Sequence, residues 1–298
     1  MNSNTPRVSV IVPHYQDLDR LDTCLNSLSR QSFPREHFEI VVADNASPVG
    51  ADAVAKVIAG RARLVVVQEK GAGPARNGGV AEARGDILAF TDSDCVPGPE
   101  WISAGVQALS SADFIGGEMK VLVDDPKSMT PSEAFEYLFA FENKLYIEKR
   151  NFTVTANLFC PSELFEKVGG FRVGLSEDIE WSHRALGMGY KIGYAPGAIV
   201  WHPARKTWPD LERKWARINT EFYLLHMSKR NGWARYILLT LYQIPSAIFQ
   251  TGRVLRSRDL DSWRKKIQVA QVLYRLRLGR FAASFSMLLT GHRAGAAE

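Results

Sequence analysis

Two aspartates one residue apart, Asp92 and Asp94, follow an apolar run in the stretch ILAFTDSDCVPGPEW. Carboxylates this close repel each other unless a cation, water or hydrogen-bond donors compensate their charge. Hard divalent cations such as Mg²⁺ and Mn²⁺ take oxygen ligands and commonly share them with phosphate groups. Asp, Ser, Pro and Gly are also ordinary turn formers, so the local pattern leaves a solvated turn open as the alternative.

A glycine-rich segment, EKGAGPARNGG at residues 69–79, lies between an apolar run and a helical pattern. Such a turn exposes backbone N–H groups that can bind anions, and Pro74 is suited to the first position of the helix. The glycines do not have the G-x-G-x-x-G spacing of a dinucleotide-binding loop. Arg76 is either a contact for a nucleotide base or diphosphate, or an ordinary surface arginine.

Three further titratable side chains depend on these motifs for their interpretation. Glu177 and Asp178 begin a helical pattern in SEDIEW, where acids complement the helix dipole whether or not they have another function. His202 follows an apolar run in IVWHP, and a single histidine there is more often structural than a ligand. They become candidates only if the fold brings them to the aspartates.

The elements that must position these residues alternate between strands and helices. The apolar runs VSVIVP, FEIVVADN, ARLVVVQ and DILAFTD are separated by segments with helical spacing. This alternation predicts βαβ units and a parallel sheet with helices on both faces. Ligands of such sheets bind at the carboxyl ends of the strands. Each predicted strand here ends in polar residues, namely His14; Asp44 and Asn45; residues 68–73; and Asp92 and Asp94.

The charge is distributed unevenly along the 298 residues, whose overall balance is +5. Residues 205–298 are helical in pattern and carry 18 Lys/Arg against 6 Asp/Glu, whereas residues 1–204 carry 19 against 26. No nucleic-acid-binding motif is recognised and the larger part is acidic, so we expect no nucleic-acid partner. A basic segment with tryptophans suits an anionic membrane surface, and packing on residues 1–204 or a homodimer contact is the alternative.

Composition places the chain among ordinary folded proteins, with 46% hydrophobic and 23% charged residues. Its three cysteines fit neither a disulfide framework nor a zinc finger, which favours a reducing compartment. No window of about 18 uninterrupted apolar residues occurs, so we expect no transmembrane helix. The apolar run at residues 8–12 is too short for a signal peptide.

Several of these motifs, in this order, resemble one family. VSVIVPHYQDLDRLDTCLNSLSRQSFP, EIVVADNAS, KGAGPARNGGVAEARGDILAFTDSDC, and VGGF followed by SEDIEW are similar to the family 2 glycosyltransferases, nucleotide-sugar-dependent enzymes with the GT-A fold. The resemblance covers about residues 7–202. It implies an α/β fold with a GT-A-like, mostly parallel sheet and helices on both faces, to which this chain adds a basic C-terminal helical extension.

The resemblance also implies roles for individual residues. Asp178 matches the catalytic base of the family, and Glu177 beside it would contact the acceptor or the sugar. The metal ligands would be Asp92 and Asp94 of the DxD motif, together with His202. Asp44 would hydrogen-bond the nucleotide base. The full set of implied nucleotide contacts is Pro13, Tyr15, Asp44, Arg76, Asn77, Asp92 and Ser93.

We therefore expect an inverting glycosyltransferase, assisted by Mn²⁺ or Mg²⁺, that acts in polysaccharide or glycolipid assembly. UDP is the default nucleotide, with dTDP and GDP left open, and the acceptor is a glycan or a lipid-linked sugar. The expected location is the cytoplasm or the cytoplasmic face of a membrane. The expected domains are a catalytic domain at 1–204, with a nucleotide half at about 7–100 and an acceptor half at about 101–204, and a helical extension at 205–298.

Residues 155–165, TANLFCPSELF, are the candidate for the acceptor-side wall. Two other functions remain as alternatives. A nucleotidyltransferase would need a phosphate-binding glycine-rich loop directly after the first strand, where this chain has PHYQDLDR. An inactive sugar-nucleotide-binding or membrane-scaffold protein would have no need of Asp92, Asp94 and Asp178.

Overall fold

The computed structural model describes residues 6–290, and its centre is a sheet of eight strands. The order across the sheet is β3-β2-β1-β4-β7-β6-β8-β5. The strands are β1 (Val8–His14), β2 (Phe38–Asp44), β3 (Arg63–Val66), β4 (Ile87–Phe90), β5 (Val96–Pro97), β6 (Phe114–Leu122), β7 (Leu158–Pro161) and β8 (Ile192–Pro203).

The first four strands of the sheet are parallel, as the alternating pattern predicts. β1 pairs with β2 and β4, and β2 pairs with β3, all in parallel register. The register places His14 opposite Asp44, so the carboxyl ends of β1 and β2 lie at one edge. The other half differs, because β7 runs antiparallel to β4 and β6, and β5 runs antiparallel to β8.

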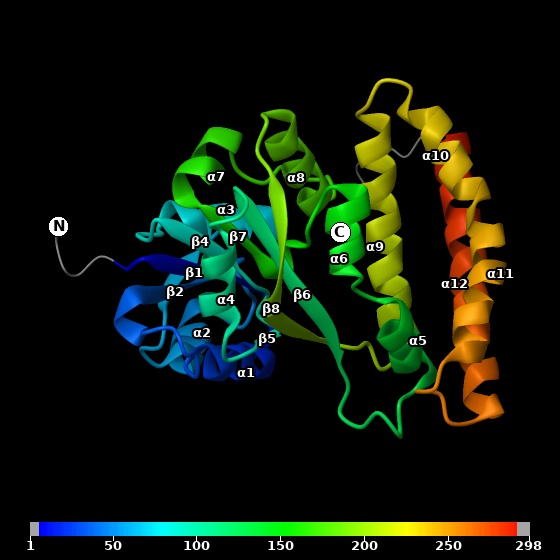
Figure 1. The fold of residues 1–298 in the computed structure, drawn as a ribbon, viewed down its shortest axis with the longest axis horizontal. Helices are drawn as coiled ribbons and strands as arrows, with labels where there is room; N and C mark the ends of the chain where they lie inside the picture. Colours follow the sequence, from blue (N-terminus) through cyan, green and yellow to red (C-terminus); the bar gives the residue numbers. More distant parts are fainter. Residues whose placement is uncertain (1–5, 291–298) are drawn as a thin grey trace. The chain divides into compact units, whose positions relative to one another are not determined.

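Helices cover both faces of this sheet (Figure 1). They are α1 (Leu18–Leu28), α2 (Ala51–Ile58), α3 (Ala72–Ala81), α4 (Trp101–Ala108), α6 (Asn143–Arg150), α7 (Ser162–Val168) and α8 (Glu177–Gly187). On one face Val10 and Val12 pack with apolar residues of α1, α2 and α4, and on the other Ile11 packs with those of α7 and α8. Successive strand residues point to opposite faces, which is why one apolar strand contributes to two cores.

The chain divides into two compact units. The first contains residues 1–120, 141–173 and 177–203, and the second contains 121–140, 174–176 and 204–298. The second unit therefore includes residues 121–140 and 174–176, which the expected extension at 205–298 does not contain. Its helices are α5 (Pro131–Phe139), α9 (Trp208–Met227), α10 (Gly232–Leu241), α11 (Gln243–Arg256) and α12 (Trp263–Thr290).

The helix α5 belongs to the second unit because its apolar face is buried there. Ala134, Phe135 and Leu138 share a core with Leu211 of α9 and Leu273 of α12. The helix begins with a capping box, in which the Thr130 hydroxyl accepts from the Glu133 N–H and the Glu133 carboxylate accepts from the Thr130 N–H. Within residues 6–290, no helix is both long and apolar enough to cross a bilayer.

Candidate active site

The carboxyl ends of β1 and β2 hold a buried carboxylate, Asp44. Its Oδ1 lies 2.8 Å from Nδ1 of His14 and also accepts from the Ser47 hydroxyl, while Oδ2 accepts from the Ser47 N–H at 3.0 Å. Burial raises the pKa of Asp44, but the hydrogen bonds from Ser47 and His14 outweigh that effect and hold the pKa below its ordinary value. Asp44 is therefore a fixed anion at the strand exit.

Neighbouring predicted nucleotide contacts differ in how much surface they expose. Tyr15 is 49% exposed, and the ammonium of Lys70 lies 5.4 Å from its ring centroid. Pro13 is buried within β1, opposite Ala43, so it has little surface to offer a ligand. The Nε2 atom of His14 is buried without a hydrogen-bond partner among the described residues. The sequence did not predict His14 and Ser47 as partners of Asp44, although His14 ends β1 and Ser47 lies three residues after β2.

Arg76 joins the exit of β4 to the start of α8. Its guanidinium is buried, and it donates through Nη2 to Oδ1 of Asp92 and through Nη1 to Oε1 of Glu177. Burial lowers the pKa of Arg76, but the carboxylates of Glu177 and Asp92 outweigh burial and raise it, so the guanidinium stays charged. The alternative of an ordinary surface arginine is excluded by this burial.

At position 73 of the glycine-rich segment, there is a steric explanation for the glycine. A Cβ atom there would lie 2.7 Å from Oε2 of Glu177, so any larger residue would displace the carboxylate that Arg76 contacts. Asn77 of the same helix uses its side-chain amide on the main chain of Phe171, donating to its carbonyl and accepting from its N–H, both at 2.8 Å. In this structure Asn77 holds the segment before α8, and its predicted contact with a nucleotide stays a prediction.

Asp94 and His202 form a candidate metal site with Cys95. One donor atom from each lies within 4.8 Å of the others, and Asp94 Oδ2 is 3.5 Å from His202 Nε2. The pairing of β5 with β8 brings these residues together, because Val96 lies opposite Trp201. The predicted ligand Asp92 instead contacts Arg76. Ser93 lies between the two aspartates and is partly exposed.

The donor atoms of this site fit a hard or borderline divalent cation. The Nδ1 atom of His202 lies 2.8 Å from the Pro203 carbonyl, which can only accept, so Nδ1 carries a proton and Nε2 is the ring nitrogen that faces Asp94. Burial raises the pKa of Cys95, and Asp94 and Asp92 raise it further, so its thiol stays protonated. Asp94 and His202 are therefore the residues suited to Mn²⁺ or Mg²⁺.

Asp178 lies at the second position of α8 and is partly exposed, and its predicted role as a base stays a prediction. Its Oδ1 accepts from the N–H of Ile179 at 2.8 Å. The helix is held in place by Trp181, which is fully buried and donates to the Gly169 carbonyl at 3.0 Å, and by Arg184, which donates to the Gly170 carbonyl at 2.8 Å. The local packing thus fixes where α8 presents its two acids.

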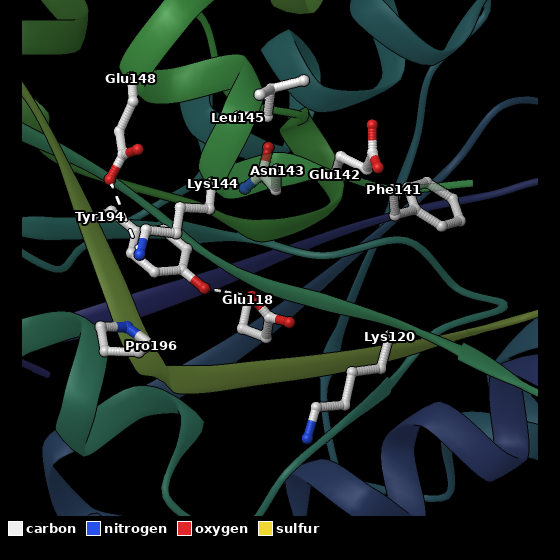
Figure 2. Close-up of a pocket in the computed structure, with 10 residues that line it drawn as sticks. All are labelled: Glu118, Lys120, Phe141, Glu142, Asn143, Lys144, Leu145, Glu148, Tyr194 and Pro196. Carbon is white, nitrogen blue, oxygen red and sulfur yellow. Dashed lines mark hydrogen bonds and ion pairs between the residues drawn. The ribbon is translucent and has the colours of Figure 1, made fainter. Parts of the chain in front are cut away.

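Most of the segment 155–165 does not form the expected acceptor wall. Residues 155–160 are buried, and Leu158–Pro161 is the strand β7 between β4 and β6, so these residues have no surface for a substrate. The expectation rested on position in the chain and is wrong for residues 155–160, because they turn into the sheet; Glu163 is exposed, and for residues 161–163 the acceptor wall stays a prediction. A cavity of the first unit lies elsewhere, between β6, α6 and β8 (Figure 2).

The sequence model described as "Glycosyl transferase family 2" matches residues 9–179. The chain is 32% identical over 250 residues to "Glycosyltransferase AglE" from Haloferax volcanii, covering 81% of each chain. It is 25% identical over 233 residues to "Probable glycosyltransferase YdaM" from Bacillus subtilis, covering 72% of this chain and 55% of YdaM.

Two solved structures have a similar fold. A mannosyltransferase from Pyrobaculum calidifontis, PcManGT, in complex with GDP-Man and Mn²⁺, gives a TM-score of 0.62 at 18% identity and covers 97% of this chain and 88% of its own. TarS 1–349 from S. aureus in complex with UDP-GlcNAc gives 0.53 at 17% identity, with 97% and 93% covered. The expected GT-A architecture is thereby confirmed.

Proposed function

The chain belongs to glycosyl transferase family 2 and is a glycosyltransferase, and we propose that it moves a sugar, with inversion, from a nucleoside-diphosphate donor to a hydroxyl of a glycan or lipid-linked acceptor. The observation that carries the mechanism is one set of contacts. Arg76 links Asp92, two residues before Asp94, to Glu177, the residue before Asp178. The buried guanidinium of Arg76 thus connects the segment of the candidate metal ligand Asp94 with that of the candidate base Asp178.

Asp94 and His202 are the residues that would hold the divalent metal. A bound cation offsets the negative charge that develops on the leaving diphosphate, and this is its contribution to the reaction. Asp92 is held by Arg76 and keeps the exit of β4 fixed beside that position. The nucleotide base would lie at Asp44 and Tyr15, at the exits of β2 and β1.

Asp178 is the proposed general base. An acceptor hydroxyl gains nucleophilicity as a carboxylate removes its proton, and attack from the face opposite the diphosphate inverts the anomeric carbon in one displacement. The bond from the acceptor oxygen to that carbon forms as the bond to the diphosphate breaks, and the proton passes to Asp178. Glu177 has a different part in this proposal, since its contact with Arg76 orients the start of α8.

A nucleotide titration tests the proposal. Calorimetry with UDP, dTDP, GDP and CMP, each with and without Mn²⁺, should show metal-dependent binding of one nucleotide to the wild type. Asp94→Ala should lose the metal dependence, and Asp52→Ala, an exposed aspartate on α2, serves as the matched control. Folded protein that binds none of the nucleotides would contradict the proposal, and binding without any transfer would favour the inactive binding protein.

The second unit supports a peripheral attachment to the cytoplasmic face of an anionic membrane. Residues 236–252 contain no charged side chain, and in α10 and α11 Leu238, Ile248 and Phe249 are each more than 60% exposed. Residues 228–258 contain six Lys/Arg and no Asp/Glu. An exposed apolar helix surface flanked by cations complements anionic headgroups over an apolar bilayer interior.

Vesicle sedimentation of the full chain tests this attachment. The wild type should bind phosphatidylcholine vesicles that contain phosphatidylglycerol, less strongly at high salt, and should bind poorly to phosphatidylcholine alone. The double substitution Ile248→Glu and Phe249→Glu should reduce binding, while Val173→Glu, an exposed control in the first unit, should not. Equal binding by the double variant would contradict the assignment to this surface.

A further inference from the structure

The first unit contains a cavity of about 650 Å³ that the proposed metal, nucleotide and base positions do not use (Figure 2). It is lined by Glu118 of β6, by residues 141–145 and Glu148 around α6, and by Tyr194 of β8. Its volume lies in the range of cavities that hold small organic ligands. The side chains that line it come from separate parts of the chain, which only the folded sheet brings together.

Carboxylates, ammonium groups and an aromatic ring share this cavity. Tyr194 donates its hydroxyl to Oε2 of Glu118, and the ammonium of Lys144 lies 6.0 Å from the centroid of the Tyr194 ring. Burial raises the pKa of Tyr194, and Glu118 raises it further, so Tyr194 remains a neutral hydroxyl at physiological pH. Among the described residues, Oε1 of Glu118 has no hydrogen-bond partner, so it remains available to a ligand donor.

Two further polar groups of the cavity, the ammonium of Lys144 and the carboxylate of Glu148, are held only weakly by each other. Lys144 Nζ and Glu148 Oε1 are 3.9 Å apart, and both side chains are at least half exposed. An exposed pair at this separation contributes little stability, so ligand hydroxyl groups can replace it at low cost. Figure 2 shows the side chains of Lys144 and Glu148 extending toward each other beside the Tyr194 ring.

This chemistry suits an uncharged glycan. Each sugar unit presents hydroxyl groups that both donate and accept, which matches carboxylate acceptors and ammonium donors placed side by side. Sugar C–H surfaces are apolar, which matches the Tyr194 ring together with Leu145 and Pro196. The cavity contains three glutamates and two lysines, so it has no excess of cations to attract a phosphate or a polyanion.

The cavity begins next to the candidate metal site. Phe141 lines it, and the ring centroid of Phe141 lies 4.9 Å from that of His202, whose Nε2 is 3.5 Å from Asp94. Phe141 has a φ of 56°, a left-handed conformation that a bulky L-residue adopts only when its surroundings impose it. In the part of the chain that the structure describes, only the ring of Phe141 therefore lies between the cavity and the imidazole of His202.

We propose that this cavity binds the part of an uncharged acceptor glycan that lies beyond the sugar whose hydroxyl reacts, with Glu118 and Tyr194 as its main contacts. The inference rests on the proposed function, because it assumes that the reacting hydroxyl meets Asp178. Glu118 and Tyr194 are then residues that select the acceptor and take no part in the chemical step.

Saturation-transfer NMR with full-length protein, UDP or GDP and Mn²⁺ tests the proposal. The probes are maltose, cellobiose, α-1,2-mannobiose and N,N′-diacetylchitobiose, with a uronic-acid disaccharide as the charged comparison. At least one neutral probe should bind the wild type. Glu118→Gln and Tyr194→Ala should each weaken it about tenfold, which corresponds to the loss of one good contact. Tyr194→Phe should weaken it less, since the ring remains.

Glu163→Gln, an exposed carboxylate on α7, is the matched control and should bind like the wild type. Nucleotide titrations of every variant should equal that of the wild type, which also shows that each variant is folded. No binding of any neutral probe, or equal binding by Glu118→Gln and Tyr194→Ala, would overturn the subsite. Failure of nucleotide binding in the wild type would count against the proposed function instead, so the two failures are distinguishable.

Discussion

Each of the two units contains a buried charge whose partners carry the opposite charge, and the signs are reversed between the two units. In the first unit the cation Arg76 contacts the carboxylates of Asp92 and Glu177, and in the second the anion Glu136 contacts the cations of Lys214 and Arg205. In both, burial opposes the charge and the partners outweigh burial, which raises the pKa of Arg76 and lowers that of Glu136.

The surroundings of the two clusters differ. Asp92 and Glu177 each lie within two residues of a candidate functional acid, Asp94 or Asp178. The partners of Glu136 instead join α5 to the start of α9, and Arg205 also donates its backbone N–H to Glu136 at 2.7 Å. A buried charge with partners of opposite charge is therefore no sign of function by itself. It suggests a function only where those partners lie next to candidate functional residues. Substitutions in the two clusters should separate activity from stability.

The largest effect on transfer should come from Asp178→Asn. Loss of a general base should lower the transfer rate by about 10²–10⁴-fold, while nucleotide binding stays unchanged. Single-turnover assays and calorimetry on the same preparation measure the two quantities, with Asp52→Asn as the control. A transfer rate equal to that of the wild type would remove Asp178 from the mechanism.

Arg76→Lys should have the next largest effect. A lysine keeps the positive charge, but a single ammonium cannot reproduce the two-sided contact of a guanidinium with Asp92 and Glu177. We expect transfer to fall about 10²-fold through misplacement of α8. The counterpart Lys214→Arg in the second unit should leave transfer unchanged. Similar transfer in both variants would mean that the Arg76 cluster has no part in positioning.

Gly73→Ala should act on the same cluster more mildly. The new Cβ would lie 2.7 Å from Oε2 of Glu177, so that acid must shift, and we expect about tenfold slower transfer. A Cβ added at Gly187, which is on α8, would meet no atom within 4 Å, so Gly187→Ala is the matched control. Equal transfer rates in the two alanine variants would show that a shift of the Glu177 carboxylate does not affect transfer.

Glu136→Gln should leave transfer by folded protein unchanged and reduce stability. Its folded pKa is below the unfolded value, so its contribution is present above the unfolded pKa and is lost as the pH falls through the folded pKa. Urea unfolding near neutral pH should show a loss of about 3 kcal/mol in the variant, and the difference should shrink below about pH 4. A difference independent of pH would contradict the ionised state of Glu136.

The parallel part of the fold could be predicted from sequence because its signals are local. Each apolar run and the polar residue that ends it are adjacent in the chain, and parallel register then places His14 beside Asp44. The partner of Arg76 could not be predicted, since Glu177 is 101 residues away and only the packing of α8 brings it close. The same holds for α5, whose short amphipathic pattern does not say which core buries it.

Burial of the three cysteines gives the chain an internal chemical probe. Cys24 packs in the core on one face of the sheet, Cys160 in the core on the other, and Cys95 next to Asp94. Burial raises the pKa of each thiol, and thiols react as thiolates, so alkylation in the native state requires local or global opening. Mass spectrometry of pulse-alkylated protein would therefore time the opening of the core that holds Cys24 and Cys95 separately from that of the core that holds Cys160, without any engineered label.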